Sequence, residues 1–142
     1  IIESYFKEFP NVKNYMDSNI SFAKENGYVE TILKRKRYLS NINSGNATMR
    51  GFDERNAINA PIQGSAADII KIAMINIYQK LEKKQLKSKL LLQVHDELVF
   101  ELFNGEEEQL SKIVRDEMMN AVKFNVPLEV EIGIGENWLE AH

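Results

Sequence analysis

Two short apolar runs, separated by only three residues, place the strongest constraint on how this chain folds. Residues 90–94 and 98–102 are rich in side chains that favour extended structure, and only His95, Asp96 and Glu97 lie between them. Two such runs with so short a connection are typical of a β-hairpin. The sequence therefore predicts a well-packed hairpin with an ionisable tip.

The N-terminal part of the chain is predicted to be mainly helical. Apolar residues recur at helical spacing over residues 1–26, where Pro10 starts a second piece and Gly27 is a favourable C-cap. Residues 28–32 are expected to be extended, and residues 38–39 are expected to form a second extended segment that runs back beside them. Residues 40–50 are rich in Ser, Asn and Gly and are expected to form a loop.

A long helix is predicted over residues 53–83, with an interruption near Pro61 and Gly64. Ser65 is expected to cap its second half, and Asp68 lies three residues on, as in a capping box. An apolar stripe follows on one face of this half. Its members are Ala66, Ile69, Ile70, Ala73, Ile77 and Leu81.

The C-terminal part is predicted to contain a helix over residues 106–124 and a half-buried strand over 128–134, where apolar and polar residues alternate. The residues of this helix expected to face the core are Leu110, Ile113, Val114, Met118 and Ala121. The order of elements indicates an α+β domain, in which a small antiparallel sheet with the hairpin packs against long helices.

Composition limits the classes of protein to which the chain can belong. Its 142 residues are 44% hydrophobic, and the length predicts one structural unit of ordinary domain size. The absence of cysteine excludes disulfides and thiolate metal sites. No apolar run is long enough for a membrane span, and no signal peptide is visible. Because the chain begins without Met in a helical pattern, we expect it to be cut from a longer protein.

The hairpin tip is the first candidate site. Asp96 and Glu97 on a rigid turn suit Mg²⁺, a hard cation that prefers oxygen ligands and substrate phosphates. A solvated turn is the simpler alternative, although the tip lacks the Gly that short hairpin turns favour. His95 alone is weak support for a metal site, and His142 is expected to have no specific role.

Two further groups of side chains are candidates for nucleic-acid contacts. Arg55, Asn59 and Gln63 are four residues apart, so they lie along one helical face, and such side chains reach base edges and sugars. The bend expected at Pro61 could displace Gln63 from this line. A basic run could hold a phosphate backbone although the net charge is −3, and its members are Lys34, Arg35, Lys36 and Arg37. The alternatives are a solvated helix face and a solvated loop.

Taken together, four segments resemble family A DNA polymerases of the bacterial polymerase I type. Residues 93–101, QVHDELVFE, resemble the family's motif C, and residues 54–71 resemble the long helix upstream of it. Residues 27–39 resemble the junction of fingers and palm, and residues 133–139, GIGENWL, resemble the family's C-terminus. The segments occur in the family's order and cover nearly the whole chain.

The resemblance implies a DNA-directed DNA polymerase of replication and repair that uses two Mg²⁺ ions, with primer–template DNA and dNTPs as partners. Asp96 matches the metal-binding aspartate, Glu97 its neighbour near the metals, and His95 a residue near the primer terminus. Arg55, Asn59 and Gln63 match minor-groove contacts, and the basic run matches a backbone-contacting segment. Residues 1–50 would be the end of the fingers with the fingers–palm junction, and residues 51–142 the C-terminal palm. A bacterial cytoplasmic protein associated with the nucleoid, not with a membrane, is implied.

The chain also departs from the family. The first metal-binding aspartate, in motif A, and the fingers helix that binds the incoming nucleotide have no counterpart in this sequence. We therefore expect the isolated chain to be inactive, to hold Mg²⁺ poorly and to expose surfaces that meet the rest of the polymerase or pair as a homodimer. The alternatives are a non-catalytic nucleic-acid-binding module with a retained polymerase fold and a metal-dependent nuclease. The intact hairpin tip argues against the first, and the single carboxylate pair against the second.

Overall fold

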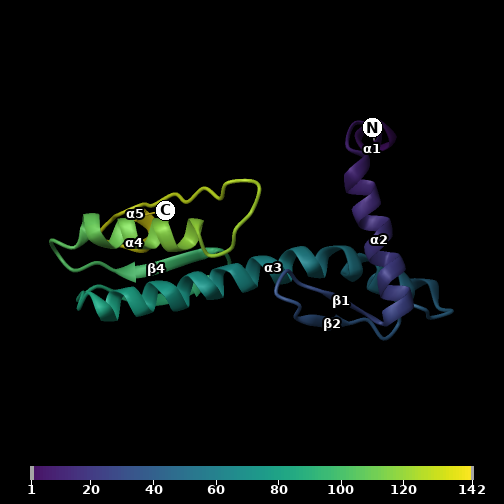
Figure 1. Ribbon diagram of the computed structural model, residues 1–142, viewed down its shortest axis with the longest axis horizontal. Coiled ribbons are helices and arrows are strands. Elements are labelled where there is room, and N and C mark those ends of the chain that lie inside the picture. The colour runs from purple at the N-terminus through teal and green to yellow at the C-terminus, as the bar shows by residue number, and fades with distance from the viewer. Residues whose placement is uncertain (1, 142) are drawn as a thin grey trace. The chain divides into compact units, whose positions relative to one another are not determined.

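The computed structural model describes residues 2–141 and confirms the α+β class. The chain forms two compact units, Ile1–Asp68 and Ile69–His142. The first contains α1 (Ile2–Glu8), α2 (Pro10–Asn26), β1 (Tyr28–Glu30) and β2 (Lys36–Tyr38). The second contains β3 (Lys89–Val94), β4 (Glu97–Glu101), α4 (Glu107–Met119) and α5 (Trp138–Ala141). Helix α3 (Ala47–Lys83) contributes residues to both units (Figure 1).

The helices at the start of the first unit form as the sequence predicts, whereas β1 ends and β2 begins two residues earlier than expected. Pro10 lies in the first turn of α2, where its missing N–H costs nothing. Gly27 ends α2 in the left-handed conformation, with φ of 79°, and its N–H donates to the carbonyl of Ala23 at 2.8 Å. Strand β1 follows at once and pairs antiparallel with β2.

A small core holds these elements together. The buried side chains come from α2, β1, the segment after β2 and α3, and they are Ala23, Val29, Leu39, Ile42 and Ala57. The buried carboxylate of Asp53 on α3 accepts a hydrogen bond from the backbone N–H of Asn41 at 2.7 Å. This bond fixes the segment after β2 against the helix.

Helix α3 begins six residues earlier than the sequence predicts and has no interruption. Its start is capped by Asn46, whose side-chain oxygen accepts hydrogen bonds from the N–H groups of Thr48 and Met49 at 3.0 and 3.3 Å. Pro61 lies inside the helix. The prediction of a break at Pro61 and Gly64 is therefore wrong, as is that of an N-cap at Ser65. Instead, Ser65 Oγ donates to the carbonyl of Pro61 at 2.5 Å within the helix.

The core of the second unit matches the predicted stripes closely. Helices α3 and α4 lie alongside β4 (Figure 1) and enclose Ala73, Ile77, Leu81, Leu110, Ile113 and Val114. Leu98, Phe100, Met118 and Ala121 pack against this cluster. Three members of the predicted stripe lie outside this cluster: Ala66 is exposed, Ile69 is half-buried, and Ile70 is buried but does not belong to it. An ion pair between Lys80 and Glu117 links the two helices at the edge of the core.

Helix α4 is shorter than predicted and is preceded by an anchoring carboxylate. It ends at Met119, not at 124, and the N–H of Asn120 closes its last turn. Just before it, the Glu106 carboxylate accepts hydrogen bonds from the backbone N–H groups of Lys87 and Ser88, at 2.9 and 2.8 Å. These donors, the Lys87 N–H foremost, hold the pKa of Glu106 below its ordinary value. The carboxylate thus fixes the turn before β3.

The predicted strand over residues 128–134 does not form, and this expectation is wrong. The segment has no regular secondary structure, and within residues 2–141 the only strand pairs are β1 with β2 and β3 with β4. The alternation nevertheless corresponds to the burial of the side chains: Leu128, Val130 and Ile132 are half-buried, whereas Glu129 and Glu131 are exposed. A half-buried extended segment keeps this pattern, but a strand also needs a hydrogen-bonding partner.

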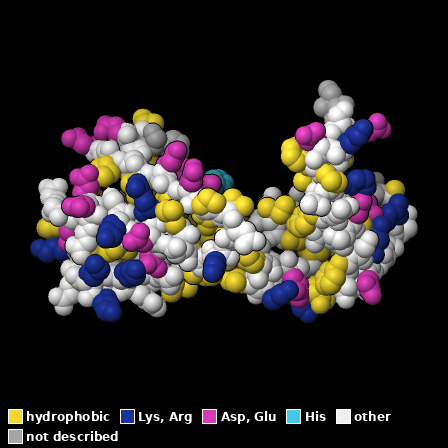
Figure 2. All heavy atoms as spheres, turned by 45° about the horizontal axis from the view of Figure 1, so that its top comes forward, with side chains coloured by type: hydrophobic (Ala, Val, Ile, Leu, Met, Phe, Trp, Pro, Cys, Tyr) yellow, Lys and Arg dark blue, Asp and Glu magenta, His cyan; other side chains and the backbone are white. Residues whose placement is uncertain are grey.

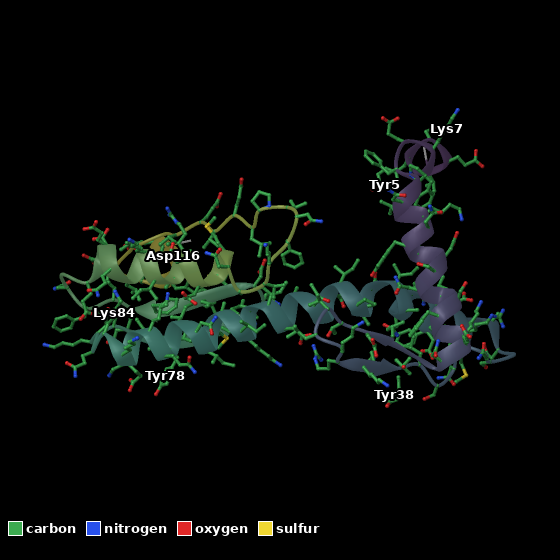
Figure 3. The ribbon with its side chains drawn as sticks, viewed as in Figure 1. Tyr5, Lys7, Tyr38, Tyr78, Lys84 and Asp116 are labelled. Carbon is green, nitrogen blue, oxygen red and sulfur yellow. The ribbon has the colours of Figure 1, made fainter. Side chains whose placement is uncertain are left out.

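Large apolar side chains remain on the surface (Figure 2). In the second unit they include Ile75 and Tyr78 on α3 and Leu91 and Leu92 on β3. Tyr78 projects from α3 away from α4 (Figure 3). None of the helices in the described part of the chain combines the length and hydropathy that a bilayer-spanning segment requires.

Candidate functional site

The hairpin tip is a two-residue turn. Val94 pairs with Glu97, so only His95 and Asp96 connect the strands and Glu97 is the first residue of β4. His95 has φ of 53°, a left-handed conformation that is uncommon for a residue other than glycine. The side-chain amide of Gln93 donates to the carbonyl of His95 at 2.7 Å and braces this turn. The expected three-residue tip is thus corrected to two residues.

The two carboxylates next to the turn have different surroundings. Asp96 is exposed at the tip, whereas Glu97 is half-buried on β4. Packing of Leu98 and Phe100 against the core of the second unit fixes β4, the strand that follows the turn. Asp96 is therefore a hard oxygen donor on a rigid support, which fits one ligand of a Mg²⁺ site. Among residues 2–141, however, no group of three or more Asp, Glu or His side chains could hold a metal ion.

The predicted helical face is present in the first unit. Arg55, Asn59 and Gln63 are all exposed, and all belong to the uninterrupted helix α3. Because the helix continues through Pro61, the four-residue spacing keeps the three side chains on one side. The hydroxyl of Tyr15 on α2 donates to the carbonyl of Ile58 at 3.2 Å and fixes α2 against this part of α3.

The basic run forms the turn between β1 and β2 and the start of β2. All four cations are exposed, and Lys34 occupies a left-handed position with φ of 65°. Lys36 Nζ lies 4.1 Å from the centre of the Tyr28 ring, and a hydrogen bond with Tyr28 raises the pKa of Lys36. Tyr38 follows on β2 with 69% of its surface exposed (Figure 3). The run thus presents cations together with an aromatic side chain.

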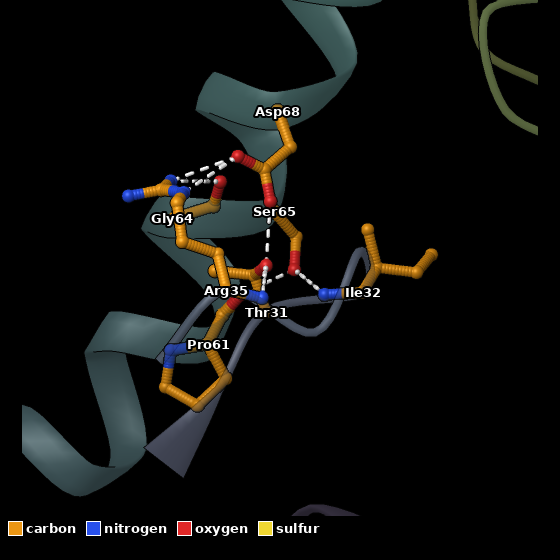
Figure 4. Close-up of polar contacts among 7 residues, drawn as sticks. All are labelled: Thr31, Ile32, Arg35, Pro61, Gly64, Ser65 and Asp68. Carbon is orange, nitrogen blue, oxygen red and sulfur yellow. Dashed lines mark hydrogen bonds and ion pairs between the residues drawn. The ribbon is translucent and has the colours of Figure 1, made fainter. Parts of the chain in front are cut away.

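Arg35 is the cation of the run that pairs with a buried carboxylate. Arg35 Nε donates to Asp68 Oδ1 at 2.9 Å, and Thr31 Oγ1 donates to Asp68 Oδ2 at 2.5 Å (Figure 4). Asp68 is buried, so the capping-box role predicted for it is wrong. The sequence did contain a signal for the buried pairing of Asp68. An Asp that lies beside Ile69 and Ile70, at the border of an apolar stripe, needs a hydrogen-bonding or charged partner if it is buried.

Gly64 permits this contact between the turn and α3. A Cβ built on Gly64 would lie 2.5 Å from Thr31 Cγ2. We expect Gly64→Ala to destabilise the chain by about 1–3 kcal/mol, because overpacking outweighs the helix propensity gained from alanine. Urea unfolding followed by circular dichroism would measure this loss. Gly51→Ala on the same helix is the matched control, since its Cβ would lie 3.7 Å from Arg55 Nη1, an ordinary contact. Equal stability of the two variants would contradict the prediction.

Comparison with known proteins gives consistent matches. The profile of DNA polymerase family A matches residues 1–140. The chain is 52% identical to DNA polymerase I of Caldicellulosiruptor bescii over 98% of its own length, and 51% identical to that of Geobacillus stearothermophilus over 99%. It covers 16% of each of these relatives.

A solved structure also matches. It is described as the POL domain of Pol1 from M. smegmatis in complex with DNA primer-template and dNTP. The TM-score is 0.96 at 48% sequence identity, and the match covers 99% of this chain and 25% of the other.

Proposed function

We propose, since this chain belongs to DNA polymerase family A, that it is the C-terminal part of a bacterial DNA-directed DNA polymerase that extends a primer from dNTPs. The observation that carries the proposal is Asp96, an exposed carboxylate on a two-residue turn of a hairpin whose strand β4 packs against the core of its unit. Residues 1–50 would serve as the end of the fingers and its junction with the palm, and residues 51–142 as the C-terminal palm.

Asp96 is the residue that would hold Mg²⁺, together with carboxylates from the remainder of the polymerase. When bound, two such ions activate the primer 3′-hydroxyl and stabilise the pyrophosphate leaving group. Glu97 lies beside Asp96 and would add negative charge to the same site. His95, exposed at the turn, would contact the primer terminus.

The exposed face of α3 and the basic run would bind primer–template DNA. Arg55, Asn59 and Gln63 would contact the minor groove, whose acceptors are nearly the same for every base pair. Such contacts test the geometry of a pair without reading its sequence, as template-directed synthesis requires. The basic run, Lys34, Arg35, Lys36 and Arg37, would contact phosphates, which position the duplex.

The isolated chain is proposed to be inactive. Asp96 and Glu97 make up one carboxylate pair, and Mg²⁺ gives up its water reluctantly for so few ligands. The exposed apolar side chains on α3 and β3 would meet the remainder of the polymerase or, in the isolated chain, a second copy. Like other bacterial enzymes of DNA replication and repair, the complete polymerase would act in the cytoplasm, at the nucleoid.

Primer extension with Mg²⁺ and four dNTPs tests this proposal. We expect no synthesis by this chain alone, and synthesis when it is mixed with a separately expressed upstream portion of the polymerase. The Asp96→Asn chain in the same mixture is the control and should give no product. Synthesis by the chain alone would refute the proposed incompleteness of the site. Normal synthesis in the mixture with Asp96→Asn would refute the role of the hairpin.

A further inference from the structure

We propose that Asp68 is a positioning residue. Its hydrogen bonds with Thr31 and Arg35 attach the turn of residues 31–35 to α3. Arg35 then anchors the turn to α3, and Lys34, Lys36 and Arg37 make the contacts with DNA phosphates. The inference rests on the proposed function, because it assigns the DNA contacts of the first unit more narrowly.

The Asp68 carboxylate is buried, with 6% of the residue exposed, and each of its oxygens accepts a hydrogen bond from a different residue of the turn. Thr31 donates to Oδ2, while Arg35 reaches Oδ1 with Nε at 2.9 Å and with Nη2 at 2.8 Å (Figure 4). Burying a carboxylate without hydrogen-bond partners costs free energy. The folded unit therefore strongly favours the conformation in which Thr31 and Arg35 both donate to Asp68.

Two further bonds join the turn to the same part of the helix. The N–H of Ile32 donates to Ser65 Oγ at 2.8 Å, and Arg35 Nη2 donates to the carbonyl of Gly64 at 3.1 Å. The turn is also closed internally, since the N–H of Thr31 donates to the carbonyl of Arg35 at 3.0 Å. Residues 31–35 therefore form a rigid loop that is attached along one turn of α3, from Gly64 to Asp68.

The remaining cations of the run differ from Arg35. Lys36 and Arg37 lie on β2, where every residue is exposed. Lys34 is paired only loosely at the surface, with Nζ 3.4 Å from Glu30 Oε2 and 80% of its side chain exposed. Surface pairs of this kind contribute little, so a phosphate can replace Glu30. These three side chains can reach a DNA backbone without breaking a buried contact.

The attachment of the turn to α3 also sets the distance between the two proposed DNA-binding surfaces, the basic run and the exposed face of α3. Gln63, at the end of the proposed minor-groove face, is the residue immediately before Gly64. Attachment of the turn at Gly64, Ser65 and Asp68 therefore fixes the basic run relative to Gln63. A duplex that places its groove on α3 would find its phosphates at a defined position, and this lowers the conformational cost of binding.

Equilibrium binding of labelled primer–template DNA to the complete polymerase, at a series of KCl concentrations, tests the inference. The slope of log Kd against log salt falls by about one for each phosphate contact that is lost. We expect Lys36→Gln and Arg37→Gln each to lower it by about one. Asp68→Asn, which loosens the turn, should lower it by one to three units, by the same estimate. Arg35→Gln should match Asp68→Asn, and the double variant should lose no more than either.

Thr31 provides a milder pair of variants for the case in which Asp68→Asn perturbs folding. Thr31→Val keeps the shape and removes the hydroxyl, so it should lower the slope and speed amide exchange at Ile32. Thr31→Ser keeps the hydroxyl and should restore both. Lys13→Gln removes a cation from an exposed ion pair on α2 and should change neither.

Three outcomes would overturn the inference. One is a slope lowered by Arg35→Gln but unchanged by Asp68→Asn, since Arg35 would then contact phosphate itself. Another is unchanged exchange at Ile32 in both Asp68→Asn and Thr31→Val, because the turn would not depend on Asp68. The third is a wild-type polymerase without salt-dependent DNA binding, which would refute the proposed function and this inference together.

Discussion

Replacing Asp96 by Asn in the complete polymerase should lower the rate of primer extension by about 1000-fold, with little change in DNA affinity. Asn keeps the shape of the side chain and removes the charge on which a Mg²⁺ ligand depends. A bound metal contributes several kcal/mol to transition-state stabilisation, and about 4 kcal/mol corresponds to this factor. Single-turnover extension under saturating DNA and dNTP would measure the chemical step.

Two control variants separate this effect from a general change of charge. Glu97→Gln should cost about tenfold or less, roughly 1.4 kcal/mol, because Glu97 lies on β4 and is not at the tip. Asp116→Asn removes an exposed carboxylate from α4 and should leave synthesis unchanged (Figure 3). If Asp96→Asn retained synthesis within tenfold of wild type, the chain would be better described as a nucleic-acid-binding module without catalytic function.

Replacing Ile77 by Ala should lower the free energy of unfolding of the chain by about 2–5 kcal/mol. Ile77 is fully buried and is among the largest such side chains in the described residues. It lies in the cluster that joins α3 and α4, so the cavity would remove contacts with both helices. Urea unfolding monitored by circular dichroism would give the difference.

Ile75 on the same helix is the matched control. It is 57% exposed, so Ile75→Ala removes the same atoms without leaving a cavity. We expect this variant to lie within about 0.5 kcal/mol of the wild-type chain. A similar loss for both variants would mean that the surface around Ile75 is covered, as it would be by a second copy of the chain.

The sequence predicted well wherever the signal lies among neighbouring residues. The end of α2 follows from Gly27, whose left-handed φ suits glycine, and the hairpin follows from two apolar runs with a short connection. The core faces of α3 and α4 follow from helical periodicity, which requires only one segment at a time. The family was evident from the order of four short motifs.

Expectations failed where the outcome depends on a distant partner. The strand over residues 128–134 has the right alternation, but strand formation needs a second strand, which no local pattern supplies. The break at Pro61 did not occur, because tertiary packing stabilises a helix more than local propensity does. Here Tyr15 and Ile32 hold the residues on either side of Pro61.

By itself, therefore, the sequence determined most of the helices, the two core faces, the hairpin that carries Asp96 and the family. Only the tertiary structure decided which charges stay available at the surface. Arg35 and Lys36 are adjacent and similar in sequence, yet Arg35 pairs with Asp68, 33 residues away, while Lys36 lies on an exposed strand. The physical reason is that a buried carboxylate must recruit partners from whatever segment the fold brings near it, and local patterns do not contain that information.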